Sequence, residues 1–290
     1  MMHARIMASQ PRISELTFTN LFIWHSVYQT EWSVYQDWLF IIGSHEGEPF
    51  ALPPVGPGPR EKAVMKLMEY LEKERGAAKP RLERADSTLM QELESDPALC
   101  IQPMREQYDY VYRSRDLIEL TGNRYHRKRN HINAMQKKYS FRYEPMEEIY
   151  VHQCTELVEK WCGIKRCEED MNLLGEWEAV GEMLAHYQAL GVRGGVILIE
   201  DRVAAFAFGE MLNPTTAVIH IEKADPEIGE LYAVINQQFA AHEFSDASFI
   251  NREQDLGEPG LRTAKMSYHP DHLVEKFLIT ISEREKGNLS

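Results

Sequence analysis

The stretch GVILIEDRVAAFAF, residues 195–208, decides the fold class of this chain. Two runs rich in β-branched and aromatic residues, 195–200 and 203–208, flank the polar pair Asp201-Arg202. Runs of this kind joined by a short polar turn predict a strand hairpin. The same pattern recurs at residues 38–52, where a polar turn separates two apolar runs. The chain is therefore expected to contain two sheet-forming regions.

Each predicted hairpin is followed by a segment with the apolar spacing of an amphipathic helix, at residues 60–75 and 229–244. Each of these segments leads to a short stretch that mixes arginine with acids, residues 81–86 and 251–255. We interpret the repeated order as a worn internal duplication. In this interpretation the hairpin at 38–52 is equivalent to the hairpin at 196–208.

The second half contains further elements in a recognisable order. Residues 149–161 and 172–190 predict two helices before the hairpin, and residues 216–222 predict a strand after it. Helices, hairpin, strand, helix and strand is the order of an acyltransferase of the GNAT type. We therefore expect an α/β (α+β) protein of two tandem GNAT-like acyltransferase domains, each a mixed central sheet flanked by helices.

A basic segment links the two predicted domains. Residues 124–143 contain seven lysines and arginines and no acid, and most of the segment is helical by composition. Pro145 is a plausible break after it. We expect an N-terminal domain of residues 1–144 that ends in this segment and a C-terminal domain of residues 145–290.

Charge restricts the classes of partner. The formal net charge of -13 argues against a protein that coats DNA, because phosphate contacts need an excess of lysine and arginine. The basic segment is the local exception, and it predicts a helical face that binds tRNA or a phosphorylated small molecule. The alternative is a solvated basic face. The candidate polyanion-binding residues are Arg124, Arg127, Lys128 and Arg129.

Membrane and secretory signals are not found in the sequence. The longest apolar stretches, residues 38–42 and 203–208, are far shorter than a membrane span, and Pro11 and Arg12 interrupt any secretory core. A cytoplasmic location with reduced cysteines is the expectation. Cys162 and Cys167 lack a neighbouring histidine, so packing at a helix end is favoured over a zinc site.

Five motifs carry a resemblance to a known family. They are FTNLFIW at 18–24, NRYHRKRNHIN at 123–133, NREQDLG at 251–257, GLR at 260–262 and KMSYHP at 265–270. Together they resemble the C-terminal domain of phosphatidylglycerol lysyltransferases over nearly the whole chain. The resemblance implies two GNAT-like domains in tandem, as in enzymes that move an amino acid from aminoacyl-tRNA onto a lipid or a peptidoglycan peptide.

Acyl transfer to an amine needs a base, donors that stabilise an oxyanion and an acid for the leaving group. Period-two alternation in the strand 216–222 places His220 and Glu222 on one face. We interpret Glu222 as the base, His220 as its neighbour, and Tyr268 as a candidate leaving-group acid. The alternatives are an edge strand with a polar side in water and, for Tyr268, packing in the core.

The segment after residue 250 has the composition of a polar network in a cleft, with amide, guanidinium and carboxylate groups close together. A solvated loop is the alternative. The candidate substrate-binding residues are Asn251, Arg252, Asp255, Arg262 and Lys265.

The expected donor is aminoacyl-tRNA, with acetyl-coenzyme A as the weaker alternative. Coenzyme A enzymes of this fold carry closely spaced glycines where this chain has Asp225-Pro226-Glu227, a predicted helix start, and only Gly229. No cofactor is assigned with certainty. Two other functions stay open: a non-catalytic GNAT-like binding or regulatory module, and an N-acetyltransferase.

Overall fold

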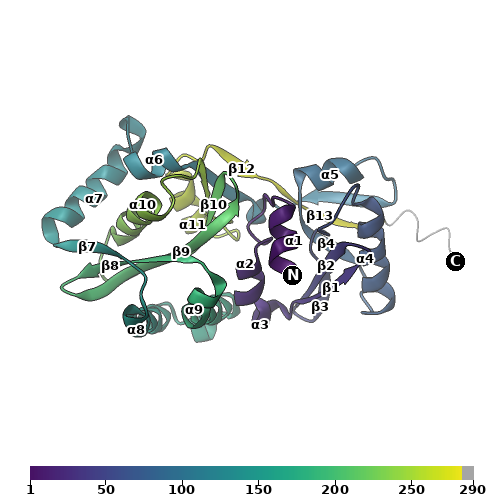
Figure 1. Ribbon diagram of the computed structural model, residues 1–290, viewed down its shortest axis with the longest axis horizontal. Coiled ribbons are helices and arrows are strands. Elements are labelled where there is room, and N and C mark those ends of the chain that lie inside the picture. The colour runs from purple at the N-terminus through teal and green to yellow at the C-terminus, as the bar shows by residue number, and fades with distance from the viewer. Residues whose placement is uncertain (283–290) are drawn as a thin grey trace. The chain divides into compact units, whose positions relative to one another are not determined.

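The computed structural model describes residues 1–282, which form two compact units, each built on one mixed sheet (Figure 1). Of the described residues, unit 1 comprises 1–109, 254–259 and 273–282. Unit 2 comprises Tyr110–Glu253 and Gly260–His272. The expected α/β class, with two mixed sheets flanked by helices, is confirmed.

The expected boundary at 144/145 differs from the observed division. The chain from Tyr110 to Pro145 belongs to unit 2, because it supplies two strands of that sheet. The C-terminal strand, in contrast, pairs inside the sheet of unit 1. Neither unit is therefore a continuous half of the sequence.

Unit 1 has a sheet of order β1-β2-β3-β4-β13-β5. Its elements are α1 (Met2–Ala8), α2 (Phe18–Ile23), α3 (His25–Tyr28), β1 (Glu31–Tyr35), β2 (Trp38–His45), β3 (Glu48–Ala51), α4 (Glu61–Lys73), β4 (Arg81–Asp86), α5 (Ser87–Leu93), β5 (Leu99–Pro103) and β13 (Lys276–Ile281). The predicted hairpin is β2 and β3, and the predicted helix after it is α4, so both are confirmed.

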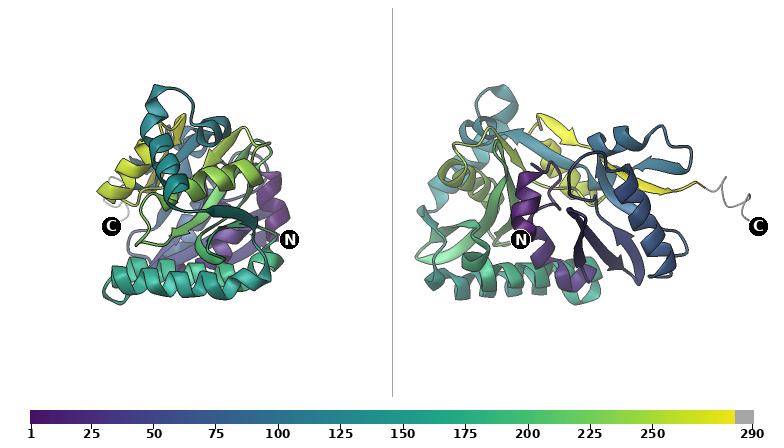
Figure 2. Two further views of the ribbon diagram at one scale, coloured as in Figure 1. Left: turned by 90° about the vertical axis from the view of Figure 1, so that its left-hand side faces the viewer. Right: turned by 45° about the vertical axis from the view of Figure 1, so that its right-hand side comes forward.

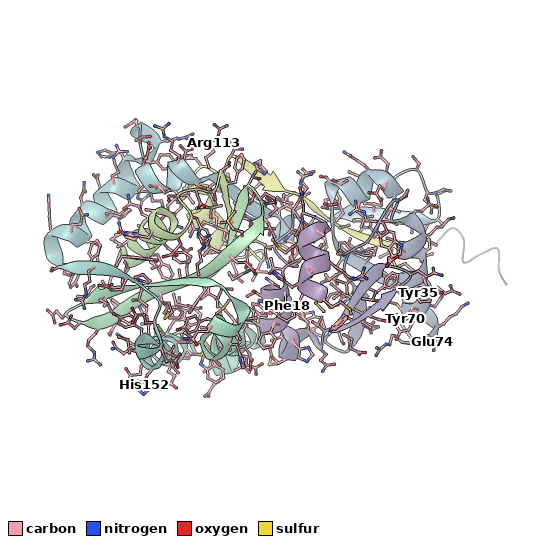
Figure 3. The ribbon with its side chains drawn as sticks, viewed as in Figure 1. Phe18, Tyr35, Tyr70, Glu74, Arg113 and His152 are labelled. Carbon is pink, nitrogen blue, oxygen red and sulfur yellow. A yellow bond between two sulfur atoms is a disulfide. The ribbon has the colours of Figure 1, made fainter. Side chains whose placement is uncertain are left out.

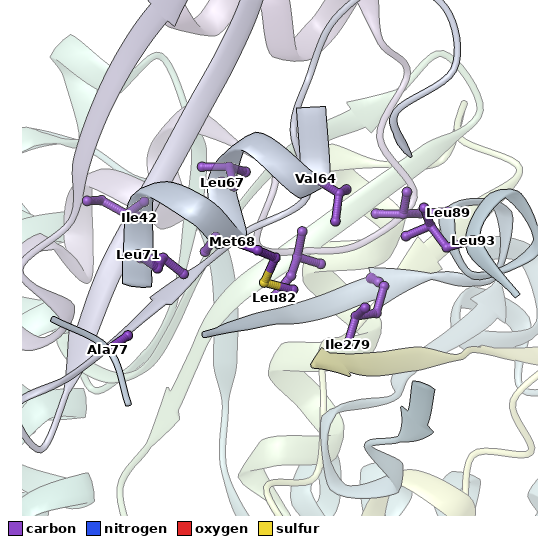
Figure 4. Close-up of a cluster of buried hydrophobic side chains, with 12 residues drawn as sticks. Ile42, Val64, Leu67, Met68, Leu71, Ala77, Leu82, Leu89, Leu93 and Ile279 are labelled. Atoms are coloured by element: carbon purple, nitrogen blue, oxygen red, sulfur yellow. The ribbon is translucent and has the colours of Figure 1, made fainter. Parts of the chain in front are cut away.

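The amphipathic stripe of α4 makes the core of unit 1 (Figure 4). Val64, Leu67, Met68 and Leu71 lie on one helix face and are buried against the sheet, which contributes Ile42 and other apolar residues. These positions are three or four apart, so burial follows from the spacing in the sequence. The cluster fixes α4 and α5 on one face of the sheet.

Unit 2 has a sheet of order β12-β6-β11-β10-β9-β8-β7. Its elements are β6 (Asp109–Arg113), α6 (Ser114–Glu119), α7 (His126–Lys138), β7 (Phe141–Pro145), α8 (Glu148–Lys165), α9 (Met171–Leu190), β8 (Arg193–Ile199), β9 (Arg202–Asn213), β10 (Thr216–Ala224), α10 (Leu231–Glu243), β11 (Phe249–Asn251), α11 (Pro259–Met266) and β12 (His272–Val274). Helices α8 and α9 lie on one face and α10 on the other, with α7 packed on α10 (Figures 1 and 2). The predicted hairpin β8 and β9, the helices α8, α9 and α10, and the strand β10 are confirmed.

The two sheets repeat one strand order. In unit 1 the antiparallel strands β1, β2 and β3 lead through α4 to β4, which is parallel to β3. In unit 2 the antiparallel strands β8, β9 and β10 lead through α10 to β11, which is parallel to β10. The order therefore matches the hairpin β2 and β3 with β9 and β10, one strand later than the equivalence expected from sequence. The match follows from the helix that connects each parallel pair, α4 in unit 1 and α10 in unit 2, because two neighbouring parallel strands need a crossover connection between them.

The basic segment is only partly helical. Helix α7 covers His126–Lys138, whereas Arg124 lies in a preceding 3-10 turn and Arg142 lies in β7. Ile132 and Met135 are buried, as the spacing predicts. The basic segment is therefore helical only from His126 to Lys138, and a single helix over residues 124–142 is not formed. Arg124 bonds to Asp116 before the helix, and Arg142 lies in β7, which pairs with β8.

Two local expectations are wrong. Cys162 and Cys167 form a disulfide instead of remaining reduced. Arg166, which follows the last residue of α8, is in the left-handed conformation and turns Cys167 back toward the helix.

Helix α10 begins at Leu231, not at Asp225-Pro226. Asp225 accepts instead from Lys160, and Glu230 has a positive φ of 69° directly before the helix.

Strand β13 brings a buried lysine into unit 1. Lys276 is fully buried, and its Nζ lies 2.7 Å from Glu15 Oε2 and 2.6 Å from Asp109 Oδ1. Asp109 also accepts from the backbone N–H of Ser14 at 2.9 Å. The three charged groups therefore tie Lys276, at the start of β13, and Asp109, at the start of β6, to the N-terminal segment around Glu15.

Replacing Lys276 by Met should destabilise the protein, because Glu15 and Asp109 would be left buried without their cation. We expect a loss of about 3–5 kcal/mol in the free energy of unfolding in urea. Lys62→Met, at an exposed position of α4, is the control and should change stability by less than about 0.5 kcal/mol. A Lys276→Met variant as stable as the control would contradict this role.

Candidate functional site

The candidate site of unit 2 lies where the parallel strands β10 and β11 separate. Their register ends at Val218 and Asn251, while β10 continues to Ala224. Polar side chains from both segments fill the space beyond this point. Strand β10 lies between β9 and β11, so the alternative of an edge strand with a polar side in water is wrong.

His220 lies between two carboxylates. Its Nδ1 is 2.9 Å from Glu253 Oε1 and its Nε2 is 3.1 Å from Glu210 Oε1, and the side chain is 1% exposed. Burial alone would lower the pKa of His220, but the hydrogen bonds and charges of both glutamates raise it to about 9. With both ring nitrogens donating, His220 is a cation at neutral pH. It ties β9 to the segment after β11, and it does not contact Glu222 through any of these bonds.

Glu222 makes an ion pair with Arg252 instead of standing alone as a base. Its Oε2 accepts from Arg252 Nη2, and its Oε1 accepts from Asn236 Nδ2 at 2.9 Å. Both carboxylate oxygens of Glu222 accept hydrogen bonds, so this side chain is better placed to orient Arg252 than to act as a base. Arg252, one of the candidate substrate-binding residues, therefore contacts Glu222 directly.

Arg252 lies among aromatic rings. Its guanidinium is 4.9 Å from the ring centroid of Tyr268 and 5.8 Å from that of Tyr112. The side chain is 12% exposed, and Nε and Nη1 are buried without a hydrogen-bond partner among the described residues. Burial opposes its charge, but Glu222 holds the pKa of Arg252 above its ordinary value. The site therefore keeps a charged guanidinium with two buried nitrogens that make no hydrogen bond within residues 1–282.

Tyr268 brings the two predicted groups of residues together. Lys128, from the polyanion set, lies with its Nζ 3.8 Å from the ring centroid of Tyr268, the ring that Arg252 also contacts. Burial lowers the pKa of Lys128 to about 8, helped by the positive charges of Arg252 and Arg127. Burial raises the pKa of Tyr268 to about 12, so it is a neutral phenol at pH 7. We call Glu222, Arg252, Tyr268 and Lys128 the Arg252 cluster.

Of the other basic candidates, two hold the chain before α7. Arg124 donates to Asp116 at 2.8 Å, and Arg129 donates to the carbonyls of Leu120 and Gly122. Arg127 is exposed beside Lys128. The cation surplus therefore concentrates at Lys128 and Arg127.

The remaining substrate candidates divide between the units. Lys265 donates to the carbonyl of Arg252 at 2.5 Å, and Asn251 accepts from the N–H of Glu253, so both shape the segment that carries Arg252. Arg262 lies one turn before Lys265 on α11 and is half-buried. Asp255 belongs to unit 1, where it binds Arg105 at 3.2 Å.

Several residues of the site were missed from sequence. Glu210, Asn236 and Tyr112 contact the candidates from β9, α10 and β6. Of these three residues, only Asn236 could have been singled out from the sequence, because it is a polar residue on the buried face of an amphipathic helix.

Residues 7–280 match the family described as phosphatidylglycerol lysyltransferase, C-terminal. The chain belongs to this family. A conserved protein of unknown function from Bacteroides thetaiotaomicron is similar in structure, with 32% identity, a TM-score of 0.90, and coverage of 97% of this chain and 95% of that one. The family membership confirms the resemblance and, with it, the tandem GNAT-like fold.

More distant relatives share the fold or part of the sequence. The C-terminal domain of a putative lysylphosphatidylglycerol synthetase from Agrobacterium fabrum has a TM-score of 0.63 at 13% identity, covering 99% of this chain and 92% of that chain. An uncharacterised protein of Mycoplasmoides gallisepticum is 22% identical over 60% of this chain. The chain spans 56% of the length of that relative. Within residues 1–282, no helix combines the length and apolar character that a bilayer crossing requires.

The charge of His220 predicts a pH dependence of stability. Its folded pKa of about 9 lies above the ordinary value of 6.5, so its stabilisation is complete below pH 6.5 and is lost as the pH rises through 9. We expect a loss of about 3 kcal/mol in the free energy of unfolding between pH 6 and pH 10.

Urea denaturation across this pH range measures the effect of His220. The His220→Gln variant should lose most of this dependence. His152→Gln, at an exposed position on α8 (Figure 3), should retain it. If the natural protein and His220→Gln have parallel pH profiles, His220 is not the charged link inferred from its contacts.

Proposed function

We propose that this chain is an acyltransferase that moves an aminoacyl group from aminoacyl-tRNA, or from another phosphorylated donor, to an amine or hydroxyl acceptor. The observation that carries the proposal is the meeting of Lys128 and Arg252 at the ring of Tyr268. Family membership supports the type of reaction. Because the proposed donor is tRNA, the reaction is placed in the cytoplasm.

The electrostatics of the Arg252 cluster favour an anionic ligand. Glu222 neutralises Arg252, and Glu210 and Glu253 surround His220. Burial lowers the pKa of Lys128, and the repulsion by Arg252 and Arg127 adds to this effect more strongly than the attraction of Glu230 opposes it. A phosphate beside Lys128 would relieve this repulsion and raise the pKa of the amine, so that Lys128 would keep its charge above pH 8.

The same groups suit the chemistry of acyl transfer. An amine attacking an ester carbonyl creates an oxyanion, and the positive charge of Arg252, whose Nε and Nη1 make no hydrogen bond within residues 1–282, suits the stabilisation of this oxyanion. Lys128, with a pKa of about 8, is the group of this cluster best matched to proton transfer near neutral pH. Glu222 holds Arg252 in place, which makes it a positioning residue in this proposal.

A non-catalytic binding module is the second candidate. The observation in its favour is that Glu222 and His220, the two polar residues of β10 first expected to be catalytic, are both fully engaged in hydrogen bonds. An N-acetyltransferase using acetyl-coenzyme A has less support, because Glu230 precedes α10 and Glu227 pairs with Lys160 where a pyrophosphate would bind.

Affinity for tRNA should depend on both salt and pH. The Arg127→Ala, Lys128→Ala double variant should bind more weakly and reduce the slope of log affinity against log salt by about 1–2. Affinity of the natural protein should fall as the pH rises through about 8, because Lys128 loses its charge. Filter binding or fluorescence anisotropy measures both quantities.

The matched control for this double variant is Lys137→Ala with Lys138→Ala, which removes two exposed charges from the other end of α7. It should leave the pH dependence unchanged. If the two double variants show the same affinity and salt slope, the Arg252 cluster is not the polyanion site.

Turnover separates the enzyme from the binding module. Glu222→Gln keeps the hydrogen-bonding shape, so a positioning role predicts less than about a tenfold loss in rate, whereas loss of a general base costs about 100-fold or more. The measurement is single-turnover release of radiolabelled amino acid from aminoacyl-tRNA with a panel of amine acceptors. Binding of tRNA without release for any acceptor would favour the non-catalytic module.

A further inference from the structure

Unit 1 contains a pocket of mixed polar and apolar lining, with a volume of about 60 Å³. Its polar lining includes Glu15 and Arg84, and its apolar walls include Trp24, Tyr28 and Phe50. Since one water occupies about 10–15 Å³ of such space, the cavity has room for a ligand of about five non-hydrogen atoms.

The cavity lies at the position in unit 1 that matches the Arg252 cluster in unit 2. Strands β3 and β4 are parallel but share only the pair Ala51 and Leu82, after which they separate. Arg84 follows two residues after Leu82, with a φ of 60°. In unit 2, Glu253 follows two residues after the last pair, with a φ of 57°. Both units therefore place a residue of positive φ two positions after the last pair; in unit 1 it is Arg84 itself, and in unit 2 it is Glu253, which directly follows Arg252.

Arg84 is built into this cavity. It is 8% exposed, and its guanidinium lies 5.3 Å from the ring centroid of Tyr28 and 5.6 Å from that of Phe50. Its Nε forms an ion pair with Glu15 Oε1 at 3.4 Å, but Nε donates no hydrogen bond within residues 1–282. A buried guanidinium held by aromatic walls with an unused donor is suited to a planar acceptor such as a carboxylate.

The charges around the cavity balance, unlike those of the Arg252 cluster. Lys276 bonds both oxygens of Glu15 and also Asp109, so two cations face two anions. A ligand with a net charge would upset this balance in a buried place. A ligand with one positive and one negative group would match Arg84 and Glu15 together.

We propose that this cavity is a binding site for a small free α-amino acid, whose carboxylate pairs with Arg84 and whose ammonium pairs with Glu15. Glycine and alanine have five and six non-hydrogen atoms, which agrees with the volume. The site is separate from the proposed transfer reaction and needs no tRNA.

Isothermal titration calorimetry on the full chain tests the proposal with glycine, alanine, propionate and ethylamine. Alanine should bind at least about tenfold more tightly than propionate or ethylamine, each of which lacks one of its two charges. Equal affinity for alanine and propionate, or no binding of either amino acid at millimolar concentration, overturns the proposal. This comparison uses only the natural protein, so it does not depend on any variant folding.

Two variants then assign the partners. Glu15→Gln should weaken the binding of alanine by about tenfold and leave the affinity for propionate unchanged or higher. Arg84→Gln should weaken the binding of both ligands. Arg81→Gln, which removes a partly exposed arginine of the same strand, is the matched control and should bind as the natural protein does. Unchanged alanine affinity in a folded Arg84→Gln variant overturns the assignment. Loss of tRNA binding has no bearing on these outcomes.

Discussion

The pairing of β13 between β4 and β5 is the constraint on which the rest of unit 1 depends. Without this strand, β5 has no neighbour in the sheet and Lys276 cannot neutralise Glu15 and Asp109. The last described strand must therefore be in place before the N-terminal sheet is complete. Such pairing between distant parts of a chain has a high entropic cost of closure, so unit 1 is expected to complete its sheet late in folding.

A second constraint is shared by both sheets, since each contains one parallel pair that separates after a short register. In unit 2 the pairs run only from Thr216 to Val218, and in unit 1 only Ala51 and Leu82 pair. Where parallel strands part, their backbone groups lose their partners, and side chains must satisfy them or water must enter. Arg252 and Arg84 lie at these points together with acids and aromatic rings. Each sheet therefore has one polar site among its apolar residues, at the point where its parallel strands separate.

Local patterns predicted local elements well and long-range contacts poorly. The hairpins and the helices α4 and α10 follow from apolar spacing within each segment. The place of β13 could not be read in this way, because strand pairing at a separation of nearly two hundred residues leaves no local pattern. The same limit applies to His220: its alternation with Glu222 was visible, but the two carboxylates that charge it come from β9 and from the segment after β11.

The duplicated frame has diverged in charge, and this difference decides what each position is suited to hold. Beside Arg252, Lys128 and Arg127 add positive charge, and burial together with the repulsion by Arg252 and Arg127 lowers the pKa of Lys128. Beside Arg84, Lys276 adds a second positive charge and Asp109, which bonds to Lys276, adds a second negative charge to that of Glu15. The two positive and two negative charges therefore cancel. An anion is therefore favoured in unit 2 and a dipolar ligand in unit 1. One backbone arrangement thus supports two kinds of recognition, because the substitutions around it change net charge without changing the strand order.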